Sequence, residues 1–113
     1  MAVVVWTDRP SDLLAAIRRE IDARRVQTWE YDSDGDFIHT PEQWRRRAWL
    51  RPKVSTDRIT FIIFPPKNIV LSREIYAVYH GRFVEMLLVH FDTDFSSANA
   101  TSMPSFGDLV KWS

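Results

Sequence analysis

The chain has 113 residues, of which 45% are hydrophobic and 13% aromatic, so it carries enough apolar surface to fold around a core and is not an intrinsically disordered segment. Fifteen basic residues balance fifteen acidic ones, and this neutral total provides no overall attraction to nucleic acid or to an anionic membrane. The absence of cysteine excludes disulfides, thiolate metal sites and a cysteine nucleophile.

The start of the chain carries no targeting signal that we can identify. Its apolar run, residues 1–6, is too short for the core of a signal peptide and follows no basic residue. No later run approaches the roughly 20 apolar residues of a membrane span. We therefore expect a cytoplasmic protein with no membrane partner.

The first 25 residues predict a strand followed by a helix. Residues 2–6 are rich in valine, and β-branched side chains favour a strand. Pro10 and Ser11 open a helix that ends near Arg25, because its apolar residues return to one side at helical spacing. These apolar residues are Leu13, Leu14, Ile17 and Ile21. The charged residues fall mostly outside this stripe and predict a solvated face.

Residues 27–40 predict a hairpin. The sequence Asp34-Gly35 is typical of a tight turn, since glycine readily adopts a positive φ. With that turn, one face carries Trp29, Tyr31, Ile38 and Thr40, and the other carries Glu30, Asp32, Phe37 and His39. The first set is the more apolar, so we expect it to face the core.

The same turn resembles a calcium-binding loop in one respect only. Asp32, Asp34 and Asp36 alternate as oxygen ligands do in such loops. The glycine comes one place too early, however, and Gln43 occupies the position of the bidentate glutamate. The sequence therefore favours a solvated turn, and we expect no metal site and no cofactor.

Residues 40–64 predict a short helix and a second hairpin. Thr40, Pro41 and Gln43 are typical of a helix start, with a cap, a proline at the first position and a glutamine three residues after the cap. Apolar and basic residues then alternate up to residue 54, and a β-rich run from Arg58 ends at two prolines after Phe64. These runs predict a hairpin over 47–64.

Residues 72–92 form the longest stretch with one consistent period and predict a helix. Ser72 is a good N-cap, and Glu74 suits the first turn. The polar arc consists of Glu74, Gly81, Glu85 and Asp92, and most of the other positions are apolar. An alternative is a hairpin that turns at His80 and Gly81, but the helix separates charged from apolar residues better. Within that helix, Gly81 suggests close packing against a neighbour.

These elements predict an α+β fold: an antiparallel sheet of four or five strands, with the helices near 11–25 and 72–92 packed on one face. We assign residues 1–95 to the domain and residues 96–113 to a loop or mobile tail, with a loop from Thr93 to Gly107. The tail carries large apolar residues that are able to dock back onto the domain. They are Phe106, Leu109, Val110 and Trp112.

The second hairpin supplies the candidate binding surface. With a loop of three residues, Trp49, Arg51 and Lys53 fall opposite Ile63, Phe61 and Ile59 on one face of the sheet. Helices on the opposite face leave these apolar side chains half-exposed, and tryptophan and arginine are enriched at protein interfaces. We therefore predict a non-enzymatic module that binds protein, either itself as a homodimer or another chain. The predicted binding residues are Arg47, Trp49, Arg51, Lys53 and Phe61.

Two other functions compete with this prediction. The basic and aromatic residues of the segment 45–53 suit single-stranded nucleic acid, because aromatic rings stack on bases and cations neutralise phosphates. An enzyme would use His39 or His90 with nearby carboxylates. The acidic hairpin argues against nucleic acid and suggests instead that it meets the basic strand of a second subunit.

Overall fold

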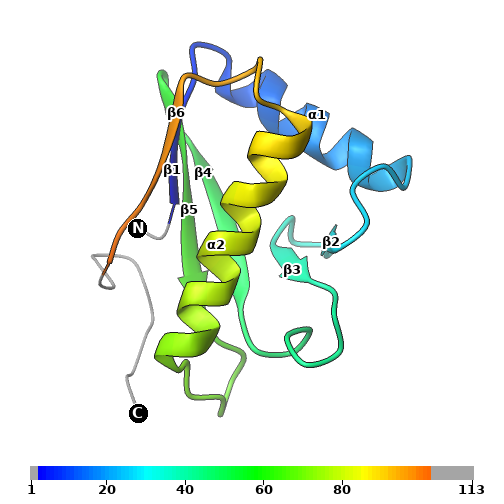
Figure 1. Cartoon of the computed structure of the whole chain (residues 1–113), viewed down its shortest axis with the longest axis vertical. Coiled ribbons are helices and arrows are strands. Elements are labelled where there is room, and N and C mark those ends of the chain that lie inside the picture. Colours follow the sequence, from blue (N-terminus) through cyan, green and yellow to red (C-terminus); the bar gives the residue numbers. More distant parts are fainter. Residues whose placement is uncertain (1–2, 103–113) are drawn as a thin grey trace.

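The computed structural model describes residues 3–102, which form one antiparallel sheet of six strands with two helices on one of its faces (Figure 1). The predicted α+β class is confirmed, with six strands rather than four or five. The strands are β1 (Val3–Trp6), β2 (Trp29–Tyr31), β3 (Phe37–His39), β4 (Trp49–Val54), β5 (Arg58–Phe64) and β6 (Ser97–Ala100). The helices are α1 (Pro10–Asp22) and α2 (Arg73–His90). Neither described helix is long and apolar enough to cross a membrane.

The order of strands across the sheet is β2-β3-β4-β5-β1-β6, so the first strand of the chain lies between β5 and the last described strand. Strand β6 lies in a segment that we predicted to be a loop. It pairs with β1, and two contacts fix its start: Thr7 Oγ1 donates to the Asp94 carbonyl (2.9 Å), and the Ser96 N–H donates to the Trp6 carbonyl (2.8 Å). The apolar tail residues from 106 onward lie outside the described residues.

The core lies between the sheet and the two helices. Both helices contribute buried side chains to a single cluster with the same face of the sheet. From the sheet come Val3, Val5, Phe37, Leu50, Ile59, Phe61 and Ile63, from α1 come Leu13, Leu14 and Ile17, and from α2 come Ile75, Tyr76, Tyr79, Phe83, Met86 and Leu87. Because strand side chains alternate between faces, the residues between these positions in β4, β5 and β1 point away from the helices.

Helix α2 confirms the predicted helix and excludes the hairpin alternative. Ser72 caps it, since its Oγ accepts the Ile75 N–H at 3.2 Å. The prediction of close packing at Gly81 is wrong: the residue is exposed, and a Cβ placed there would meet no atom within 4 Å.

The first hairpin exists, but its register differs from the prediction. Trp29 pairs with His39 and Tyr31 with Phe37, so Phe37 and His39 are buried, while Ile38 lies on the other face. The turn is a five-residue loop because the Asp32 carboxylate accepts the backbone N–H groups of both Asp34 and Asp36 at 3.0 Å. This side-chain contact competes with the tight two-residue turn that we expected.

The helix predicted after Thr40 does not form. Residues 41–47 are hydrogen-bonded turns, in which the Pro41 carbonyl accepts the N–H groups of Trp44 (2.8 Å) and Arg45 (3.0 Å). The chain has to reverse here, because β4 returns beside β3 with Leu50 opposite Phe37. Tyr79 of α2 donates its hydroxyl to the Trp44 carbonyl at 2.6 Å and fixes the reversal.

The second hairpin is confirmed, and its register lies one residue from the prediction. The Ser55 N–H donates to the Arg58 carbonyl (2.8 Å), which makes the connection shorter than the three-residue loop. Val54 then pairs with Ile59, and Trp49 pairs with Phe64. Since side chains alternate with a period of two, this shift of one residue exchanges the face on which each β5 side chain lies.

Candidate protein-interaction surface

The side of the sheet opposite the helices, called here the outer face, carries side chains of β4, β5 and β1. It consists of Trp49, Arg51, Lys53, Arg58, Thr60, Ile62, Phe64, Val4 and Trp6, which occupy alternate and mutually paired positions. None of the helices in residues 3–102 packs on this side. Val4 and Thr60 at its centre are nearly buried, whereas Trp6 retains 36% of its surface and Arg51 retains 56% of its side-chain surface. The accessible part of the outer face is therefore its large aromatic and basic side chains.

Aromatic rings on the outer face lie in contact with each other and with guanidinium groups. The ring centroids of Trp49 and Phe64 are 5.2 Å apart, and the Arg51 Cζ lies 4.7 Å from the Phe64 centroid. Arg58 lies in the same way over Trp6, with its Cζ at 5.3 Å. Stacking of a cation on a ring at an exposed site is worth about 0.5–1 kcal/mol and holds both side chains in one orientation. These contacts therefore hold the ring and guanidinium side chains of the surface in defined orientations.

Four of the five predicted binding residues lie on or beside this surface in the structure, and the fifth, Phe61, lies in the core instead. Trp49, Arg51 and Lys53 lie on the outer face, and Arg47 is exposed in the turn before β4. Phe61 is fully buried in the core, with its ring centroid 4.5 Å from that of Phe83. The position of Phe61 on the predicted surface was wrong because the register was shifted by one residue.

The β5 side chains that lie on the outer face are Ile62 and Phe64 rather than Phe61, and the sequence analysis does not predict them as binding residues. Ile62 pairs with Arg51 and Phe64 with Trp49 on the outer face, and both are half-buried. Both faces of β5 carry large apolar residues, so hydrophobic alternation alone does not decide which set faces the core. The turn decides, and its length is not evident from Ser55, Thr56 and Asp57.

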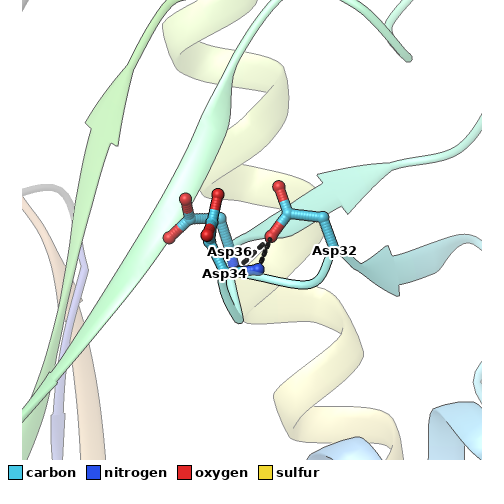
Figure 2. A group of neighbouring side chains, drawn as sticks. All are labelled: Asp32, Asp34 and Asp36. Atoms are coloured by element: carbon cyan, nitrogen blue, oxygen red, sulfur yellow. Dashed lines mark hydrogen bonds between the residues drawn. The ribbon is translucent and has the colours of Figure 1, made fainter.

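An acidic loop borders the outer face beside β4. Asp32, Asp34 and Asp36 bring carboxylate oxygens within 4.8 Å of one another, and Figure 2 shows the three groups gathered around the loop, with Asp32 accepting two backbone N–H groups. Asp36 is buried and accepts two bonds from Arg51, Nε to Oδ1 and Nη2 to Oδ2, each at 2.9 Å. The hydrogen bonds from Arg51 to the Asp36 carboxylate are the main cause that raises the pKa of Arg51.

These contacts account for two of the three aspartates. Asp36 is neutralised by Arg51, and Asp32 holds the loop through the backbone. A cation at this position would compete with the guanidinium group for the same oxygens. The Arg51–Asp36 pair thus joins β4 to the first hairpin, and the Asp32 contacts hold the conformation of the loop.

The two candidate histidines, His39 and His90, lie in different environments. His39 is buried, its Nδ1 lies 2.8 Å from the Thr28 carbonyl, and its ring packs on Trp29 with centroids 4.6 Å apart. Burial is the main cause that lowers the pKa of His39. His90 is exposed at the end of α2. Within residues 3–102, neither His39 nor His90 is hydrogen-bonded to a carboxylate.

The basic segment 45–53 is partly neutralised. Arg45 pairs with Glu30, with Nη1 to Oε1 at 2.5 Å, and Arg51 pairs with Asp36. Arg46, Arg47 and Lys53 are exposed and have no ion-pair partner in the described part of the chain. The charge available to phosphates is therefore smaller than the sequence indicates.

A cleft of about 720 Å³ lies away from this surface, between α1, the turn that precedes it and the segment 93–96. Its charged residues are all exposed and have both signs: Arg9 and Arg19 against Asp8, Asp12 and Asp94. Among its described lining residues, the buried polar side chain of Thr7 already donates to the Asp94 carbonyl, and the exposed charges have both signs, so the cleft indicates no particular class of ligand.

Comparison with known proteins identifies no relative: no protein-family model matches the chain, and neither the curated proteins nor the solved structures contain a significant match.

Proposed function

We propose that this chain is a protein-interaction module that binds another protein surface through the outer face of its sheet. The observation that carries the proposal is the pair of rings, Trp49 and Phe64, which lie half-exposed and side by side on a face that no described helix covers. Tryptophan and arginine around an apolar centre are the residues that most often dominate binding energy at interfaces.

The composition of the surface supports protein rather than nucleic acid as the partner. Two of the basic residues in 45–53 are already bound by carboxylates, and the acidic loop lies beside the strand that would have to receive phosphates. The apolar side chains of Ile62 and Phe64 also favour a protein partner, because burying them against charged phosphates gains no stability. Catalysis has less support, because neither His39 nor His90 is hydrogen-bonded to a carboxylate in the described residues; Glu85 and Glu20 act on them only electrostatically.

The test is the substitution Trp49→Glu, compared with Val89→Glu as a matched control. Val89 is 67% exposed on α2, away from the outer face, so the control introduces the same charge at another exposed apolar position. Circular dichroism first establishes that both variants fold. We expect Trp49→Glu to weaken association at least tenfold, by light scattering and by capture of partners on immobilised protein, while Val89→Glu leaves it unchanged.

Ile62→Lys provides a second substitution on the same face, in case Trp49→Glu perturbs β4. If both folded outer-face variants associate and capture partners as the wild type does, the outer face is not the binding surface. Absorbance at 260 and 280 nm of the purified wild type identifies bound nucleic acid and would favour the competing function.

A further inference from the structure

We infer that the partner of the outer face is a second copy of this chain, bound face to face around a two-fold axis. This inference rests on the proposed function and specifies its partner. It follows from the distribution of charge across the surface, where an acidic group and a basic group lie next to each other and neither is fully satisfied within the described residues.

The acidic group is the loop that carries Asp34. This residue is exposed, and its carboxylate has no hydrogen-bond or ion-pair partner among the described residues. Asp32 beside it keeps one carboxylate oxygen, Oδ1, on the loop backbone. Both carboxylates act on Arg51 electrostatically, which places them near the outer face of β4.

The basic group lies along β4. Lys53 follows Arg51 by two residues and therefore lies on the same face, about 7 Å farther along the strand. It is exposed and has no described partner, and neither has Arg47 before the strand. Between the two groups, the Arg51–Asp36 pair shows that opposite charges of this surface already meet within one chain.

Two-fold symmetry turns these neighbours into complementary partners. In an isologous interface, each patch of one subunit meets the corresponding surface of the other, so a contact between two different patches is made twice. An axis that passes between the acidic loop and Lys53 places Asp34 of each copy beside Lys53 of the other. In this face-to-face arrangement, Trp49, Ile62 and Phe64 of each copy are covered by the outer face of the other, which helps to exclude water from the charge pairs.

A charge-reversal series tests this arrangement in the full chain. Light scattering on a sizing column at micromolar concentration should give a dimer near twice 13.3 kDa for the wild type. Lys53→Glu and Asp34→Lys each place like charges together at two positions of the dimer, and each should weaken dimerisation at least tenfold. The double variant restores opposite charges and should return to within about threefold of the wild type, since charge complementarity is regained. Arg19→Glu on α1 is the matched control and should dimerise normally.

Mixing gives the sharpest result. In an equimolar mixture of Lys53→Glu and Asp34→Lys chains, only a heterodimer has opposite charges at both contacts, so two weakly associating variants should form a dimer together. A monomeric wild type at micromolar concentration would overturn the inference, as would a dimer that neither reversal affects.

The outcomes separate this inference from the proposed function. A monomer that still captures another protein through Trp49 leaves the outer face as a binding surface and removes only the second copy as its partner. Loss of both the dimer and capture in Trp49→Glu, together with recovery of the dimer when Lys53→Glu and Asp34→Lys are combined, supports the inference and the proposed function together.

Discussion

At the scale of single residues, His39 makes a prediction about pH. Burial lowers its pKa from 6.5, so the folded chain keeps the imidazole neutral under conditions where the unfolded chain protonates it. The unfolded state therefore binds more protons as the pH falls below 6.5, and the free energy of unfolding decreases from there down to the pKa of the folded state. Above pH 6.5 both states keep His39 neutral, so the stability that depends on the neutral imidazole is fully present.

Urea denaturation from about pH 7.5 to about 5.5 measures this contribution. We expect stability to fall with decreasing pH in the wild type and to fall less steeply in His39→Gln, which cannot take up the proton. His90→Gln, at an exposed histidine, should behave as the wild type. Equal slopes for the wild type and His39→Gln would show that another group governs the dependence.

Individual residues also show how much of the site the sequence could predict. Trp49, Arg51 and Lys53 alternate, and this alternation correctly places them together on one face. Phe61 was misplaced because β5 is apolar on both sides, so only the turn at Ser55 distinguishes its two faces. The pairing of Asp36 with Arg51 joins residues from different hairpins, and no local pattern indicates such a contact.

At the scale of elements, the two glycines predict opposite effects of the same substitution. Gly81 lies inside α2 with open space around its Cβ position, so Gly81→Ala should stabilise the chain by about 0.5–1 kcal/mol through helix propensity. Gly35 has a φ of +84°, and a Cβ there would lie 2.7 Å from Arg18 Nη2. Gly35→Ala should therefore destabilise the chain.

Denaturant midpoints at constant chain concentration compare both variants with the wild type. A destabilising Gly81→Ala would mean that an unseen neighbour packs on this side of α2, which is the reading that we drew from the sequence. An unchanged midpoint for Gly35→Ala would mean that the Asp32 loop relaxes into another turn.

Elements with strong local signals were predictable, and those fixed by distant contacts were not. Ser72 and the long apolar period predict α2 because capping and burial act within the segment. The cap signature at Thr40 fails because the chain must reverse to pair β4 with β3, and Tyr79 from a distant helix holds that reversal. Tertiary contacts override the local preference there.

At the scale of the whole molecule, the fold class follows from the amino-acid composition and from the periodic spacing of apolar residues, whereas the order of the strands does not. Strand β6 has the sequence Ser-Ala-Asn-Ala, which has weak strand propensity. It exists because β1 has a free side, and Thr7 is joined to Asp94 across 87 positions of sequence. Pairing over such a distance leaves no periodic trace in the sequence, so the sixth strand could not be anticipated.

The two-copy assembly makes a final prediction for the whole molecule, because a dimer links folding to chain concentration. If only the folded state associates, each tenfold rise in concentration adds about 1.4 kcal/mol to the stability of the dimer. The Tm of the wild type should then rise with concentration, measured by circular dichroism over a wide range, and so should that of Arg19→Glu. The Tm of Lys53→Glu should depend on concentration much less, because its like charges oppose association, and mixing it with Asp34→Lys should restore the dependence. A wild-type Tm that stays constant across concentrations would mean that the outer face is not occupied by a second copy in solution.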